Sequence, residues 1–85
     1  MGINSKSQKI NDAYFARSMV ENAFEFSCNR TGFKVSLDKD NENVLVTLPK
    51  QKRPSVKITV KEAMGMTGSQ RNEWCRNISR SIDAT

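Results

Sequence analysis

The lysine and arginine side chains in the second half of the chain are the residues whose type and spacing could do chemistry. Residues 46–85 carry eight basic and three acidic side chains, whereas residues 1–45 carry six of each, so the net charge of +5 belongs to one region. A one-sided positive field attracts a polyanion, because neutralised phosphates release their counterions. We therefore expect a nucleic-acid-binding surface built from Lys50, Lys52, Arg53, Lys57, Lys61, Arg71, Arg76 and Arg80.

The composition does not favour catalysis. Histidine, the commonest general base and metal ligand, is absent, and the sequence offers no evident nucleophile–base pair. A zinc site would need carboxylates from scattered positions, because the chain has only two cysteines. The sequence therefore predicts a protein that is not an enzyme and that uses no metal or cofactor.

The length of 85 residues predicts a single domain, residues 1–85, with frayed ends at residues 1–5 and 83–85. No apolar run is long enough for a signal peptide or a membrane span, so we expect a cytoplasmic protein. In that compartment Cys28 and Cys75 are expected to be reduced and partly buried.

The first element predicted is a helix over residues 7–28, which Gly32 and the polar residues before it bring to an end. Arg17 interrupts its main apolar stripe, which consists of Ile10, Ala13, Val20, Ala23 and Phe24. A second apolar line beside it consists of Phe15, Met19 and Phe26. So wide a face exceeds what one small sheet covers, and we therefore expect a homodimer.

Three strands follow in the prediction. Alternating apolar residues indicate strands at residues 33–37 and 44–48, and the polar residues 38–43 between them indicate a hairpin turn. The segment Pro49–Pro54 has a proline at each end, which predicts an extended connection outside the sheet interior. Alternation resumes at Val56–Val60, the third strand.

The C-terminal part predicts one helix or a helix pair. Thr59–Glu62 matches a capping box, so a helix is expected to begin there and run to about Met66. Gly68 is expected to break it, and Ser69 to cap a last helix that runs through Ile82. The apolar face of that helix would consist of Trp74, Cys75, Ile78 and Ile82. The whole order predicts an α+β fold with a three-stranded antiparallel sheet (α-β-β-β-α).

Three parts of the basic region have two interpretations. The cations of Pro49–Pro54 suit phosphate contact, but they would equally protect a sheet edge and keep the chain soluble. Arg76 and Arg80 would form either a phosphate-facing pair or a solvated helix face. Trp74 could stack on an unpaired base, although its helical phase with Ile78 favours the core or a dimer interface.

The predicted order, followed by Thr59-x-Lys61-Glu62-Ala63, resembles the double-stranded-RNA-binding domain. In that family the last helix opens with Ser or Thr, several lysines and Glu-Ala, and the lysines meet phosphates across the groove. The resemblance implies a phosphate contact for Lys61. Val60 and Met64 stand where the family prefers lysine.

Residues 59–78 also resemble the helix-turn-helix of excisionase-like and MerR-like regulators, which share a TVxEA opening, a turn glycine and an apolar residue about six positions later. Gly68 and Trp74 occupy the last two places. This resemblance implies that residues 69–72 open a recognition helix in which Arg71 contacts base edges. The Thr-x-x-Glu opening is also a general helix start, so both resemblances stay open.

The leading hypothesis is a small, basic, non-enzymatic nucleic-acid-binding protein that prefers RNA to DNA, contacts the backbone and reads little sequence. Five or six phosphate contacts would make log affinity fall against log salt with a slope of about −4 to −5. One alternative is a helix-turn-helix DNA-binding regulator. The other is a phage-type modulator or inhibitor of a host nucleic-acid-handling enzyme, such as a ribonuclease or toxin. A membrane partner is not expected.

Overall fold

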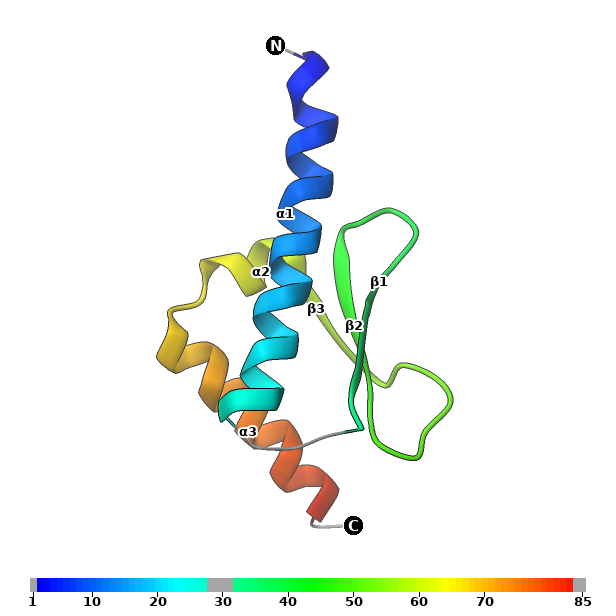
Figure 1. The fold of residues 1–85 in the computed structure, drawn as a ribbon, viewed down its shortest axis with the longest axis vertical. Helices are drawn as coiled ribbons and strands as arrows, with labels where there is room; N and C mark the ends of the chain where they lie inside the picture. Colours follow the sequence, from blue (N-terminus) through cyan, green and yellow to red (C-terminus); the bar gives the residue numbers. More distant parts are fainter. Residues whose placement is uncertain (1, 28–31, 84–85) are drawn as a thin grey trace.

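A three-stranded antiparallel sheet with helices beside it forms the body of the protein (Figure 1). The structure, a computed structural model, describes residues 2–27 and 32–83. Its elements are α1 (Gly2–Asn22), the π-helical turn η1 (Ala23–Ser27), β1 (Lys34–Leu37), β2 (Asn43–Thr47), β3 (Val56–Thr59), α2 (Val60–Gly65) and α3 (Gly68–Asp83). The predicted α+β order is confirmed. Within the described residues no helix combines the length and hydropathy that crossing a bilayer requires.

Strand β2 lies at the centre of the sheet and pairs antiparallel with β1 and β3. Helix α1 packs on one face of the sheet, and its first turns extend past the sheet's end (Figure 1). Helix α2 follows β3 directly and packs against α1, whereas α3 packs against η1. On the other face Lys34, Ser36 and Lys57 are exposed, so this outer face of the sheet is open to solvent.

The core lies between α1 and the inner face of the sheet. Ala13, Ala16 and Val20 of α1 are fully buried, as are Val44 and Val46 of β2. Small alanine side chains let the helix backbone approach the strands closely, so the valines of β2 fill the remaining space. The alternation predicted for the strands is confirmed, because every inward residue is either buried or packed against this core.

Phe24 connects the core between α1 and the sheet to helix α3. Its ring stacks on Phe33 at 4.2 Å between centroids, and Trp74 of α3 lies tilted at 6.1 Å. Trp74 therefore belongs to the core, as its helical phase with Ile78 predicts. Cys75, next to it, is fully buried, whereas we expected partial burial. Cys28 lies outside the described residues.

Only one side of α1 is covered by the chain itself. The main stripe is buried except for Ile10, which lies in the part of the helix where it leaves the sheet and is 41% exposed. The second line is mostly uncovered, since Phe15 is 58% and Phe26 75% exposed. Helix α1 also begins at Gly2, earlier than predicted, and changes to the π-helical turn at Ala23.

Two helix caps determine how α2 and α3 begin. Thr59 caps α2 as predicted: its Oγ1 accepts from the backbone N–H of Glu62 at 3.0 Å. The prediction for α3 was wrong, because Thr67 rather than Ser69 is the cap. Its Oγ1 accepts from the N–H of Gln70 at 3.1 Å, and Gln70 Oε1 accepts from the N–H of Thr67 at 2.9 Å. This reciprocal pair is a capping box, and it places Gly68 inside the helix instead of at a break.

The connection between β2 and β3 is a turn and not the extended segment that its prolines predicted. The N–H of Gln51 donates to the carbonyl of Leu48 at 3.1 Å, which closes a β-turn. Pro49 occupies the second position of this turn and Lys50, with φ 70°, the third, as in a type II turn. The fixed φ of proline suits the second position, so Pro49 bends the chain here instead of extending it.

Candidate nucleic-acid interface

The structure divides the eight predicted cations among three places. Lys50, Lys52 and Arg53 lie in the β2–β3 loop, and Lys57 lies on β3 at the base of that loop. Lys61 lies on α2, while the remaining three arginines lie on α3. The fold therefore does not bring all eight cations into one continuous surface.

The strand register brings one further cation to the loop. Lys57 pairs with Leu45 of β2, and Lys34 of β1 pairs with Thr47. Because the valines and isoleucine of these strands face inward, alternation points Lys34 and Lys57 to the outer face. Sequence reasoning missed Lys34, since it belongs to the electrically neutral half of the chain; the predicted strand alternation was the signal that could have found it.

We call this group the basic surface, and all of its members are exposed: Lys34, Lys50, Lys52, Arg53 and Lys57. The ion pair that the structure describes joins Lys9 to Glu42, and none of the five cations has a carboxylate partner among the described residues. Their charge is therefore directed to solvent. Four of these cations lie at one end of the sheet and Lys57 lies midway along its outer face, and together they form a local positive field.

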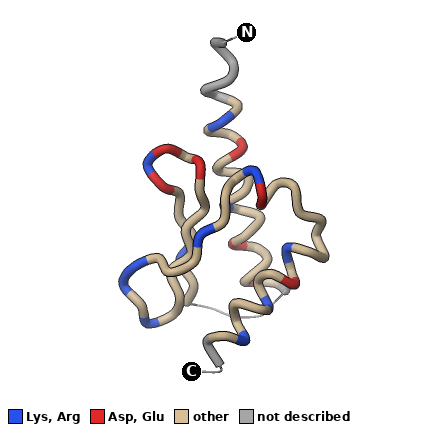
Figure 2. The backbone as a smooth tube through the Cα atoms, turned by 180° about the vertical axis from the view of Figure 1, so that it is seen from behind, with Lys and Arg blue, Asp and Glu red and all other residues tan. Residues whose placement is uncertain are grey.

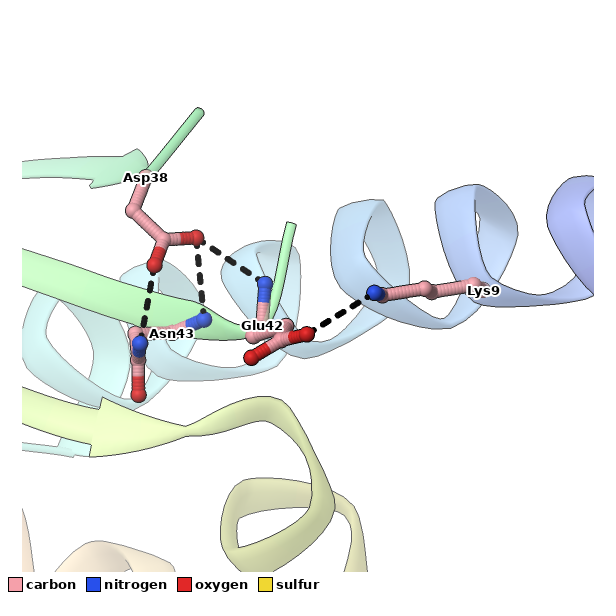
Figure 3. A network of polar contacts seen from close by, with 4 residues as sticks. All are labelled: Lys9, Asp38, Glu42 and Asn43. Atoms are coloured by element: carbon pink, nitrogen blue, oxygen red, sulfur yellow. Dashed lines mark hydrogen bonds and ion pairs between the residues drawn. The ribbon is translucent and has the colours of Figure 1, made fainter. Parts of the chain in front are cut away.

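The acidic residues of the hairpin turn lie at the other end of β2. In Figure 2 the β1–β2 turn carries the acidic positions and the β2–β3 loop the basic ones, well apart from each other. Asp38 organises the acidic turn, since its carboxylate accepts from the N–H of Glu42 at 2.9 Å and from the N–H and side-chain amide of Asn43 (Figure 3). Glu42 in turn pairs with Lys9 at 3.0 Å. The molecule is therefore electrically polarised along its sheet.

The hydrogen bonds from Asn43, with further ones from the backbone of the turn, lower the pKa of Asp38. A carboxylate whose pKa is lower in the folded than in the unfolded chain stabilises the fold above its unfolded pKa, and that stabilisation is lost as the pH falls through the folded pKa. We predict that Asp38→Asn lowers the melting temperature at about pH 7, and that the gap to wild type narrows below about pH 4. Thermal melts followed by circular dichroism measure this.

Asp40→Asn in the same turn is the control for removing one negative charge, because Asp40 is exposed. It should lower the melting temperature at neutral pH less than Asp38→Asn does. A gap between Asp38→Asn and wild type that stays constant from neutral to acid pH would contradict the role assigned to this carboxylate.

Lys61 does not join the basic surface. It lines an open groove of about 710 Å³ between α1, the hairpin turn and α2, together with Lys9, Asp12 and Glu42. The charges around this groove are mixed. The length of β3, roughly 13 Å at the usual rise per residue, separates Lys61 from the loop.

The arginines of α3 form a separate group. Arg71 is half-buried, and its Nη2 donates to the carbonyl of Met66 at 3.2 Å. Its guanidinium therefore helps to hold the α2–α3 connection. Arg76 and Arg80 are exposed on the side of α3 away from its buried Cys75, and Arg80 contacts Asn77 at 3.5 Å. These two cations remain accessible, on an element that carries none of the basic surface.

Comparisons of this chain with family models, with curated proteins and with solved structures returned no match. The two resemblances noted in residues 59–78 therefore remain predictions.

Proposed function

We propose that this protein binds nucleic acid through the basic surface and contacts the phosphate backbone rather than the bases. The observation that carries the proposal is the placement of four exposed cations at one end of the sheet and of a fifth, Lys57, midway along its outer face, with the acidic turn at the opposite end. Such a dipolar arrangement orients a polyanion toward the loop and keeps it away from the acidic residues. RNA is the preferred partner in this proposal, and no reaction is assigned to the site.

The conformation of Lys50 supports a role for its charge. A non-glycine residue at φ 70° carries a backbone strain of order 1–3 kcal/mol, and glycine would fit the third position of this turn without that strain. The strained position nevertheless holds a lysine. The turn fixes its backbone, which reduces the ordering entropy lost when the side chain meets a phosphate.

The chemistry of the outer face supports backbone contact. Besides Lys34 and Lys57 it carries exposed Ser36, half-buried Leu45 and buried Thr47, and no aromatic ring lies on this face within β1, β2 and β3. Proteins that hold unpaired bases stack them on aromatic side chains. A surface of cations without such rings suits phosphates, which carry no sequence information.

The start of α3 is less suited to a recognition role. Gln70 is engaged in the capping box with Thr67, and Arg71 donates to the backbone of Met66. These hydrogen bonds hold both side chains against the protein and restrict how far they can reach toward a base edge. For this reason the proposal places the contact on the basic surface, and it leaves Arg76 and Arg80 as auxiliary phosphate contacts.

Fluorescence anisotropy with labelled duplex RNA, duplex DNA and single strands of mixed sequence tests the proposal at about 50 mM salt, where phosphate contacts are strong. We expect binding to both duplexes, tighter for RNA, and affinities that differ little between unrelated sequences. Absence of binding to every probe would overturn the proposal. A marked preference for one DNA sequence would favour the helix-turn-helix alternative instead.

Pull-down from a lysate with and without nuclease distinguishes nucleic-acid binding from the alternative, in which the protein modulates an enzyme. A partner that survives nuclease treatment contacts the protein directly. A partner released by nuclease was held through nucleic acid, as the proposal expects.

A further inference from the structure

Helix α1 has an uncovered strip on the side that faces away from the sheet. Phe15 and Phe26, the two aromatic side chains of this strip, are 58% and 75% exposed. Phe15 lies on α1 and Phe26 on η1, the π-helical turn that continues it. Eleven residues, about three helical turns, separate the two rings, so they lie toward the same side. The strip, which we call the α1 strip, consists of Asn11, Phe15, Ser18, Met19, Asn22 and Phe26.

The direction of the strip follows from the buried residues of the same helix. At 100° per residue, Phe15 lies about 140° around the helix from Val20, which is fully buried against the sheet. A monomer therefore offers these rings no sheet to pack on. Met19, which lies between them in the strip, is half-buried.

The exposed aromatic surface is large for a protein of 85 residues. Two rings of this size and exposure leave roughly 200–300 Å² of apolar surface in water. Two copies packed through this face would remove about twice that area, and the polar rim between the rings adds to it. The sum approaches the roughly 1,000 Å² that a specific interface requires.

The charges around the strip favour a second copy over a polyanion. From Gln8 to Phe26 the charged residues of the helix are two basic and three acidic, and none of them belongs to the strip: Lys9, Asp12, Arg17, Glu21 and Glu25. A nucleic acid would find no cation on this strip. Two copies of a chain with net charge +5 can approach here, because the excess positive charge lies on other elements.

We propose that the α1 strip is the interface of a homodimer in which two α1 helices pack against each other across a two-fold axis. An antiparallel arrangement brings Phe15 of one copy near Phe26 of the other and sets the two helix dipoles in opposite directions, which is the favourable side-by-side orientation. Because α1 and the outer face lie on opposite sides of the sheet, both basic surfaces stay open. The dimer does not depend on the proposed function.

Light scattering coupled to size exclusion at about 100 µM protein tests the proposal in the absence of nucleic acid. We expect the wild-type chain to have the mass of a dimer and Phe15→Glu that of a monomer. Two charges enter the interface with each substitution, so the dissociation constant should rise about 100-fold or more. Phe26→Ser is the second variant, and it should also raise the dissociation constant of the dimer.

Tyr14→Glu is the matched control. Tyr14 is 53% exposed, nearly as much as Phe15. It lies about 100° around the helix from Phe15 and does not belong to the α1 strip. This variant should remain a dimer, and circular dichroism should show that all variants are folded. A monomeric wild type would overturn the inference, as would dissociation by Tyr14→Glu together with a dimeric Phe15→Glu.

Discussion

Reversing two charges in the β2–β3 loop should reduce nucleic-acid affinity about 100-fold. The double variant Lys52→Glu/Arg53→Glu removes two cations and introduces two anions on exposed positions. Four changed units of charge at roughly 0.7 kcal/mol each, within the range for solvent-exposed pairs, amount to about 2.8 kcal/mol, or roughly 100-fold. Both residues are exposed, so the fold should be unaffected. Anisotropy with a duplex RNA at about 50 mM salt measures the change.

The control applies the same change of net charge at the other end of the sheet. Lys39 lies in the acidic turn and Lys61 beside the groove, and both are exposed. Lys39→Glu/Lys61→Glu should weaken binding by less than about 5-fold, through the long-range field alone. Equal losses in the two double variants would mean that net charge, rather than the basic surface, governs binding.

Phe24→Ala should be the most destabilising single substitution in the core. The side chain is 2% exposed and contacts both Phe33 and Trp74, so its removal leaves a cavity between α1, the strand entry and α3. Such truncations lower the free energy of unfolding by about 3–5 kcal/mol. A domain of this size has little stability to spare, so the variant should be largely unfolded at 37 °C.

Urea denaturation followed by tryptophan fluorescence measures this loss, because Trp74 is the only tryptophan and its ring lies next to Phe24. Tyr14→Ala, which truncates a half-exposed ring on the same helix, should change the free energy of unfolding by less than about 1 kcal/mol. A loss below about 1 kcal/mol for Phe24→Ala would show that the aromatic cluster does not hold α3 to the body.

The sequence predicts the order of elements and the inward face of each strand, because alternation and three-four spacing are local patterns. The same logic predicts Thr59 as a helix cap, since a capping box is complete within four residues. The prediction overlooked a second such box, Thr67-x-x-Gln70, because the glycine at position 68 predicts a break between two helices.

The candidate site could be predicted only in part. The loop cations follow from the charge run, but the addition of Lys34 depends on the register that sets it opposite Thr47, a contact between distant segments. The separation of Lys61 from the loop also depends on tertiary structure, because four residues of extended strand lie between them and Val60 then turns the chain into α2. The Phe24–Phe33–Trp74 cluster is likewise invisible to a local pattern.

The proposed binding depends on phosphate contacts by the five cations of the basic surface. The slope of log affinity against log salt counts such contacts, at about 0.9 per phosphate neutralised on a duplex. We predict a slope of about −4.5 for the wild type and about −2.7 for Lys52→Glu/Arg53→Glu, with the Lys39→Glu/Lys61→Glu control unchanged. A wild-type slope shallower than about −2, or a slope that the loop variant leaves unchanged, would contradict the account.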